Sequence, residues 1–298
     1  MKFPRTMLEQ VITVGGLISF HYFEYAKGFV FEGEEHDFWE FLYVDKGEVE
    51  VRADDRLLDM KQGEIIFHKP HEFHTVRVRE HHTPPNLIVI SFECASPAMS
   101  AFAERRFALD GRERNLLSLL MQEGFQAFEP PWGDPSYHRL ERRADAPFGS
   151  EQLVNAYLEI LLISLARRAS APAADGVKIS HVRKEKSDEQ HAEQIIEYMR
   201  SHLSDPLSLD DLGRALHLGK SRLKEIMHAH TGMGVMEYFK SLRIEQAKTM
   251  IRESQCTYTE IAEKLGYSGI HYFSRDFRKK TGMSPSEYAK TVQARMRL

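Results

Sequence analysis

Two stretches near the C-terminus carry polar and cationic side chains at helical spacing. The first contains Lys220, Ser221, Arg222, Lys224 and Glu225, and the second contains Ile270, His271, Ser274, Arg275 and Lys279. Such side chains, on a helix presented by a tight turn, can reach base edges in a major groove of DNA. A guanidinium is best shaped to take both acceptors of a guanine, so Arg275 is the strongest candidate for reading a base. Lys279 is better placed to meet a phosphate.

The elements that must present these side chains are encoded twice. Residues 208–212 recur in similar form at 257–261, a displacement of 49, and residues 231–233 recur at 281–283, a displacement of 50. A displacement near fifty is the size of a supersecondary unit used twice. Two copies with matching starts, turns and stops predict two helix-turn-helix units. The alternatives are a solvated face of an ordinary helical pair and, for Arg275, a bracing salt bridge near Asp276 or with Glu287.

Polar N-caps and glycine C-caps bound the helices of each copy. An N-cap hydroxyl accepts a hydrogen bond from a backbone N–H that has no partner within the helix, and an acidic side chain three residues later interacts favourably with the positive end of the helix dipole. A glycine just after a helix favours a left-handed cap. The capping boxes are Ser208 with Asp211 and Thr257 with Glu260, and the C-cap glycines are Gly232 and Gly282.

The second copy resembles a known family. Its sequence reads Ile261-Ala262-x-x-Leu265-Gly266-Tyr267-Ser268, then Tyr272-Phe273-Ser274-Arg275-x-Phe277-Arg278-Lys279-x-Thr281-Gly282-Met283-Ser284-Pro285-Ser286-Glu287-Tyr288. This is similar to the signature of the AraC family of bacterial transcription regulators, and the resemblance covers about the last hundred residues. It implies a double-stranded DNA operator as partner, with RNA polymerase as a further expected partner.

A long amphipathic helix is expected between the two units, over residues 235–253. A single rigid helix would fix the separation of the two recognition helices, so that both could enter successive major grooves, about 34–36 Å apart. Arg243 on this helix could approach a phosphate, or it could be an ordinary exposed arginine.

Composition and charge describe a globular chain of about two domains. The 298 residues hold two cysteines, Cys94 and Cys256, with no second cysteine or histidine at ligand spacing, which fits a reducing cytoplasm. No signal peptide or membrane span is indicated, so we expect a cytoplasmic protein. Residues 187–298 carry 17 Lys and Arg against 15 Asp and Glu, a net of +2, whereas residues 1–186 carry 23 against 29, a net of −6. This asymmetry fits a DNA-binding module joined to a module that does not bind DNA.

Short apolar runs separated by turn signals predict an all-β domain over residues 11–93. The expected strands are Leu17–Tyr25, Glu40–Val44, Glu48–Val51, Glu64–Phe67, Thr75–Val78 and Leu87–Phe92.

This segment resembles the cupin barrel, and AraC-type regulators commonly carry such a domain to sense a small molecule. The first cupin motif, Gly-x5-His-x-His-x3-Glu-x6-Gly, falls on Gly28, Glu34, His36, Glu40 and Gly47, with Glu34 in place of one histidine. The second motif keeps Gly63 and His74 but departs from the pattern at Lys69, His71 and Val78. The resemblance implies an effector pocket at Glu34, His36, Glu40 and His74. Imidazole and carboxylate could also ligate a divalent transition metal, but we expect a metal-free pocket and no cofactor.

A broad apolar face runs along residues 150–168, where Leu153, Tyr157, Leu161 and Leu165 recur every four residues and Val154, Leu158 and Leu162 widen the stripe. In AraC-like regulators a helix at this point packs against its copy, so we expect a homodimer in which a charge at Leu161 or Leu158 gives a folded monomer. The alternative is that the chain's own core covers the whole face. Residues 169–187 lose periodicity and are expected to be a linker.

The expected architecture is therefore multidomain. Residues 1–168 should form an all-β, cupin-like effector-binding and dimerisation domain with flanking helices. Residues 169–187 should link it to an all-α DNA-binding domain, residues 188–298, with two helix-turn-helix units. We expect a transcription regulator responding to a small molecule such as a sugar or an organic acid. A metal-dependent cupin enzyme fused to a DNA-binding module and a nucleoid-type binder without sequence preference are the alternatives.

Overall fold

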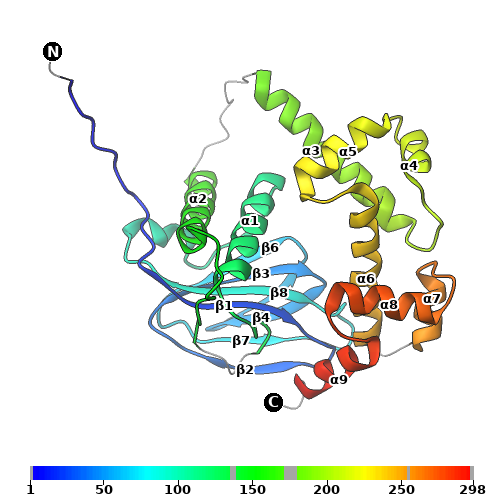
Figure 1. The fold of residues 1–298 in the computed structure, drawn as a ribbon. Helices are drawn as coiled ribbons and strands as arrows, with labels where there is room; N and C mark the ends of the chain where they lie inside the picture. Colours follow the sequence, from blue (N-terminus) through cyan, green and yellow to red (C-terminus); the bar gives the residue numbers. More distant parts are fainter. Residues whose placement is uncertain (1–2, 135–138, 171–179, 254–255, 296–298) are drawn as a thin grey trace. The chain divides into compact units, whose positions relative to one another are not determined.

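Two antiparallel sheets build the N-terminal part of the chain (Figure 1). The strands are β1 (Gly16–Glu24), β2 (Val30–Glu34), β3 (Trp39–Lys46), β4 (Glu48–Ala53), β5 (Arg56–Lys61), β6 (Glu64–His68), β7 (His74–Arg77), β8 (Asn86–Glu93) and β9 (Arg106–Ala108). One sheet has the strand order β1-β8-β3-β6-β9 and the other has the order β2-β7-β4-β5. This computed structural model describes residues 3–134, 139–170, 180–253 and 256–295.

Alternation along the strands divides the apolar residues between two cores. Successive side chains of a strand point to opposite faces, so Leu42 and Val44 of β3 lie in a core between the two sheets. Phe41 and Tyr43 lie in a second core, which the five-stranded sheet shares with two helices, α1 (Gly111–Ala127) and α2 (Ser150–Ser170). The helices cover the outer face of that sheet (Figure 1). The space between the sheets is thereby left to be lined by inward-facing residues, as in a cupin-like barrel.

All six expected strands are present, and three further strands were not expected from the sequence. Strand β2 is an edge strand with exposed residues at alternate positions, β5 is an edge strand of mixed burial, and β9 has only three residues. After β8 the chain forms a short 3-10 helix, η1 (Pro97–Phe102), and after β9 it forms α1. A capping box between Asp110 and Glu113 starts α1.

The C-terminal part is all-helical. Its helices are α3 (Ser180–Ser201), α4 (Leu209–Ala215), α5 (Lys220–Thr231), α6 (Val235–Glu253), α7 (Tyr258–Lys264), α8 (Ile270–Thr281) and α9 (Pro285–Arg295). Helices α4 and α5 form one helix-turn-helix unit, α7 and α8 form the second, and α6 connects them. Both expected capping boxes are present. Gly232 and Gly282 adopt the expected left-handed conformation at the C-caps of α5 and α8, with φ of 69° and 77°.

The chain divides into two compact units, Met1–Ala174 and Asp175–Leu298. The linker expected at residues 169–187 overlaps helix α2, which ends at Ser170, and helix α3, which begins at Ser180. Residues 171–179 lie outside the described residues, so the exact extent of the linker stays a prediction. No helix in the described ranges has both the length and the apolar run needed to cross a bilayer.

Candidate functional site

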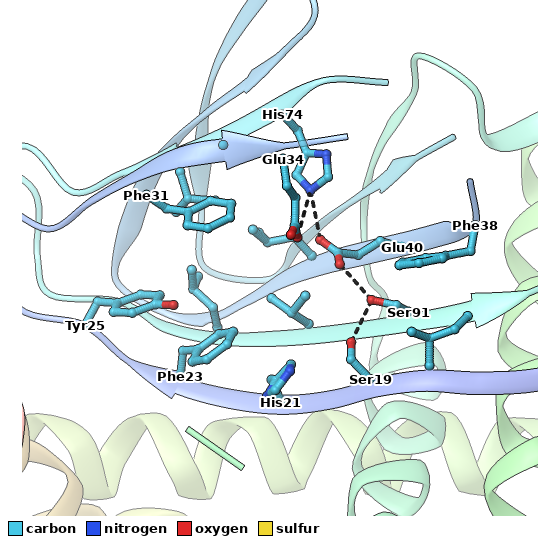
Figure 2. A pocket seen from close by; sticks show the side chains of 16 residues that line it. Ser19, His21, Phe23, Tyr25, Phe31, Glu34, Phe38, Glu40, His74 and Ser91 are labelled. Atoms are coloured by element: carbon cyan, nitrogen blue, oxygen red, sulfur yellow. Dashed lines mark hydrogen bonds and ion pairs between the residues drawn. The ribbon is translucent and has the colours of Figure 1, made fainter. Parts of the chain in front are cut away.

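The four residues expected at the pocket meet at one point of the N-terminal unit. A ligand atom from each of Glu34, His36, Glu40 and His74 lies within 4.8 Å of the others. Nε2 of His74 is 3.3 Å from Oε1 of Glu40 and 3.8 Å from Oε1 of Glu34. Nε2 of His36 is 3.7 Å from Oε2 of Glu40. Glu34 comes from β2, His36 from the β2–β3 connection, Glu40 from β3 and His74 from β7. Figure 2 shows Glu34, Glu40 and His74 directed toward one another.

Strand register and one glycine bring these side chains together. Glu34 is the register partner of His74 in the β2–β7 pair, directly after a register shift. Gly33, within this irregularity, has a φ of +109°, and an added Cβ would lie 2.7 Å from the carbonyl oxygen of His74. Only glycine avoids both the strain and the clash. We infer that Gly33 lets β2 approach β7 closely enough for Glu34 to reach the cluster.

A hydrogen-bonded serine pair extends the cluster across the five-stranded sheet. Glu40 of β3 faces Ser91 of β8 in register, and the Ser91 hydroxyl donates to Oε2 of Glu40 over 2.7 Å. The Ser91 hydroxyl lies 2.7 Å from that of Ser19 on β1. The serines were not expected from the sequence, because only the pairing of β1, β8 and β3 places them beside Glu40.

Charge interactions within the cluster and burial shift the pKa values of Glu40 and His74 in opposite directions. Burial alone would raise the pKa of Glu40, but its close contacts with the imidazoles of His36 and His74 hold that pKa well below its usual value. Burial would likewise lower the pKa of His74, but the contact with Glu40 and its negative charge raise it. Glu40 is therefore ionised, and His74 is biased toward the imidazolium form.

Backbone carbonyls orient both imidazoles. Nδ1 of His36 lies 3.0 Å from the carbonyl oxygen of Phe38, and Nδ1 of His74 lies 3.1 Å from that of Glu72. A carbonyl oxygen only accepts, so each Nδ1 carries a proton and each Nε2 faces the cluster. This is also how proteins orient histidines that bind metals. Glu34, His36, Glu40 and His74 could thus hold a divalent transition metal, which would supply a positive centre for an anionic ligand.

The cluster forms one end of a cavity of about 290 Å³ between the two sheets. Glu34, Glu40 and His74 line this cavity, whereas His36 contacts Glu40 but is not among the lining residues. Figure 2 shows the rings of Phe23, Tyr25 and Phe31 at the other end of the cavity. The remaining lining residues are Ile18, Ser19, His21, Gly33, Phe38, Leu42, Val76, Leu87, Val89 and Ser91.

The aromatic lining comes mostly from one strand and was not expected as part of the site. His21, Phe23 and Tyr25 alternate along β1 and its end, and their rings stack with centroids 4.9 Å and 5.1 Å apart. The alternation of period two was visible in the sequence and indicates that the three residues share one face. The sequence did not reveal that this face lines a cavity.

In the first helix-turn-helix unit, two of the expected DNA-binding cations are held within the protein. Lys220 lies 2.7 Å from Asp210, and Arg222 forms ion pairs with Asp188 and with Glu225, the latter at 2.9 Å. Ser221 and Lys224 are exposed on α5. Because Lys220 and Arg222 are held in ion pairs, α5 presents fewer free cations than the sequence suggests.

In the second unit, Arg275 is exposed on α8 and lies over the ring of Tyr272, 5.0 Å from its centroid. Among the described residues Arg275 makes no ion pair, and Glu287 instead accepts the backbone N–H of Ser284 over 2.7 Å. His271 and Lys279 are also exposed, whereas Ile270 and Ser274 are half-buried. Tyr272, 56% exposed, was not singled out from the sequence although it lies on the same helix. The proposed alternative of a bracing salt bridge to Glu287 finds no support in this geometry.

Arg243 of α6 is half-buried and makes its contacts within the domain. Its Nε donates to the carbonyl oxygen of Leu203 over 2.9 Å, and one terminal nitrogen donates to that of Asp205 over 2.7 Å. Its guanidinium also lies 4.7 Å from the ring centroid of Phe239 and 5.7 Å from that of Tyr267. Burial lowers the pKa of Arg243. These contacts favour a bracing role. Arg243 is half-buried and is therefore not the ordinary exposed arginine of the second expectation, and the phosphate contact stays a prediction.

The apolar face of α2 is divided between the core and the surface. Leu158 and Leu161 are fully buried in the chain's own core, so a charge at either position would destabilise the domain and would not produce a folded monomer. This corrects the choice of residues made from the sequence. Leu153 and Ile160, seven residues apart on the helix, are 40% and 42% exposed.

Two family models match the chain, one in each unit. The model described as AraC-like ligand binding domain matches residues 17–116, and the model described as Helix-turn-helix domain matches residues 212–291. The first range spans both sheets and the cluster, and the second covers the two helix-turn-helix units from Leu212, within α4, onward.

Similar proteins include bacterial regulators of comparable length. The uncharacterized HTH-type transcriptional regulator YfiF of Bacillus subtilis is 24% identical over 255 residues, covering 84% of this chain and 76% of that protein. The Msm operon regulatory protein of Streptococcus mutans is 22% identical over 272 residues, covering 90% and 89%. A solved regulator of Chromobacterium violaceum with an AraC-type DNA-binding domain is 19% identical, covering 36% of this chain and 96% of that one. Its TM-score is 0.34.

The fold and the site define a protein with a ligand-binding β domain and a DNA-binding domain of two helix-turn-helix units. The chain belongs to the AraC family of transcription regulators. Its domains and its relatives are those of a transcription regulator and not of an enzyme.

Proposed function

We propose that this regulator binds a small-molecule effector in the cavity of its N-terminal unit and thereby changes the affinity of its C-terminal unit for a specific operator. The observation that supports this proposal best is the cavity itself, where convergent polar groups lie at one end and aromatic rings at the other. A mostly apolar cavity with a few fixed polar groups is the usual form of a small-molecule site. The sequence suggested a sugar or an organic acid as the effector. The charge of the side chains that line the cavity helps to decide between chemical classes of effector.

The operator is proposed to span two successive major grooves, one for each helix-turn-helix unit. In α8, exposed Arg275 and His271 would meet base edges and Lys279 would meet the phosphate backbone. In α5, Ser221 and Lys224 would play the corresponding parts. The ion pairs of Lys220 and Arg222 would have to open, or these residues would only hold the unit together.

The active species is proposed to be a cytoplasmic homodimer that contacts RNA polymerase at its promoters. The exposed pair Leu153 and Ile160 supports a dimer contact along α2, since apolar residues seven apart form a seam between helices. The effector cavity is proposed to work without a resident metal. In its support, no hydrogen bond orients Glu34 within the described part of the chain, whereas metal-binding carboxylates are usually held in this way.

Affinity for DNA, measured with and without candidate effectors, tests the proposal. Operator fragments selected from the DNA that flanks the gene for this protein should bind the protein at least about 10³-fold more tightly than scrambled DNA at physiological salt. A nucleoid-type binder would show no such preference. A compound that raises the melting temperature of the full chain should also change its operator affinity, because a ligand that binds only the folded state stabilises it.

A further inference from the structure

Acidic groups dominate the polar end of the cavity. Glu40 is buried there, and Glu34 reaches the same point with 44% of its side chain exposed. None of the residues lining the cavity is a lysine or an arginine. The basic groups of the lining are the imidazoles of His21 and His74, and only His74 contacts the two carboxylates. The cavity therefore presents hydrogen-bond acceptors and an excess of negative charge to any ligand.

The other end and the walls of the cavity are apolar. Figure 2 shows the rings of Phe23, Tyr25 and Phe31 gathered away from Glu40 and Ser91. Leu42, Val76, Leu87 and Val89 complete the walls. A volume of about 290 Å³ admits only a small molecule, at the lower end of the usual range for ligand sites. The apolar part of that molecule would lie among the rings, where burial of its surface favours binding.

We propose that the effector is a small organic amine whose protonated nitrogen lies against Glu34 and Glu40 and whose apolar body lies against the aromatic rings. The inference rests on the proposed role of the cavity as the effector site. An ammonium group donates hydrogen bonds to both carboxylates and neutralises the excess charge. An organic anion would meet two carboxylates, and among the lining residues only the imidazolium of His74, already in contact with both carboxylates, could offset the cost of its burial.

Hydroxyl groups could also donate to the two carboxylates, but they would leave the excess charge in place. A hydroxyl that donates to an ionised carboxylate already makes a charge-assisted hydrogen bond. The ammonium adds the attraction between opposite charges at close range, which we take as about ten-fold in affinity. The amine should therefore bind about ten-fold more tightly than the alcohol with the same apolar body.

A matched panel of compounds tests this proposal on the full chain. The probes are 2-phenylethylamine, 2-phenylethanol and 3-phenylpropanoate, together with the corresponding cyclohexyl and straight-chain hexyl sets. Thermal shift and calorimetry give the affinity of each probe. Within at least one set the amine should bind best, the alcohol about ten-fold more weakly, and the carboxylate not measurably.

Two neighbouring glutamates supply a matched pair of variants. Glu34→Gln should weaken amine binding about ten-fold and leave alcohol binding within about two-fold, because it removes the charge but keeps the shape. Glu35→Gln is the control, since Glu35 is exposed, lies 3.8 Å from His71 and does not line the cavity. It should change neither affinity.

Three results would overturn the proposal. They are a carboxylate that binds as tightly as its matched amine, equal effects of Glu34→Gln and Glu35→Gln, and a panel in which no amine binds. Elemental analysis of the same protein identifies one reason for tight binding of a carboxylate probe. A stoichiometric metal, on which the binding of that probe depends, would show that Glu34 and Glu40 hold a metal ion and not an amine. If a sugar or an acid instead raises the melting temperature and alters operator affinity, the effector function stands and the amine class is wrong. If no compound that binds the cavity alters operator affinity, the proposed function itself is wrong.

Discussion

Arg275 is the side chain of α8 that the protein leaves available for a base. It is exposed, it has no ion pair among the described residues, and its guanidinium rests over the ring of Tyr272. This cation–π contact restrains the guanidinium without using its N–H donors. A side chain ordered in this way loses less conformational entropy when it binds a guanine.

Arg275→Ala should cost about 1–3 kcal/mol of binding free energy on the operator and relax the preference at one base pair. Lys279→Ala, at the far end of the same helix, should weaken all DNA sequences alike and lower the slope of log affinity against log salt by about one. Competition binding against operators with single-base changes, repeated at several salt concentrations, measures both effects. Equal losses for Arg275→Ala on operator and scrambled DNA, or a loss mainly of melting temperature, would show a phosphate contact or a brace.

Individual site residues could be predicted where local spacing marks them, but not where strand pairing assembles them. The spacing of Glu34, His36 and Glu40 within one segment was informative, and the distant His74 was placed by the motif. Ser19 and Ser91 join the site through the β1–β8–β3 register, which no local pattern reveals. The position of His36 outside the cavity lining depends on side-chain packing, since its ring stacks on that of Phe38.

At the scale of elements, α6 holds the two helix-turn-helix units together through Arg243. Its guanidinium donates to carbonyls of the segment before α4 and lies near Tyr267, in the turn of the second unit. Gly266 permits this close approach. It has a φ of +67°, and an added Cβ would lie 2.3 Å from the carbonyl oxygen of Ser204 and 2.9 Å from Arg243. The loss of Arg243 should therefore loosen the relative placement of the recognition helices.

Arg243→Ala should lower the free energy of unfolding by about 2 kcal/mol, since two hydrogen bonds from the guanidinium to backbone carbonyls are lost. Binding to a two-groove operator should weaken, while the salt dependence of binding should stay the same because no phosphate contact is removed. Lys240→Ala is the matched control, an exposed cation on the same helix. Thermal unfolding and a salt titration of operator affinity check both expectations. A flatter salt dependence with unchanged stability would show that Arg243 contacts a phosphate and does not brace the domain.

Helix α2 offers a surface contact that is separate from its core contact. Ile160→Asp places a charge at a position that is 42% exposed, so it should yield a folded monomer with stability within about 0.5 kcal/mol of the parent chain. Leu161→Ala, one residue away and fully buried, should instead cost about 2–5 kcal/mol of stability. Sedimentation and thermal unfolding separate the two effects. A parent chain that is already monomeric at micromolar concentration would remove the dimer proposal.

The prediction of elements from the sequence succeeded where caps, turns and apolar periods agree. Both capping boxes and both glycine C-caps were predicted and are present, because each depends on residues only three or four positions apart. The division of the α2 face into buried Leu161 and exposed Ile160 could not be predicted. It depends on the angle at which the five-stranded sheet and α1 meet this helix.

At the scale of the whole molecule, regulation requires that two sites in different units of the chain exchange free energy. The proposed effector cavity lies in the unit Met1–Ala174 and the DNA-reading helices lie in the unit Asp175–Leu298. An effector can alter DNA affinity only by its different affinities for the DNA-competent and DNA-incompetent states. The coupling must then be the same in both directions, and it is typically about 1–3 kcal/mol, or about 5–150-fold in affinity.

Operator DNA should therefore change the affinity of the cavity for its effector by the same factor by which the effector changes operator affinity. The compound with the largest thermal shift on the full chain serves as the effector, titrated by calorimetry with and without saturating operator, and scrambled DNA serves as the control. Glu34→Gln should weaken effector binding in both titrations and leave the operator affinity of the unliganded protein unchanged, because Glu34 lies outside the DNA-binding unit. An effector affinity that is indifferent to operator DNA would mean that the compound binds the cavity without acting as the regulatory ligand.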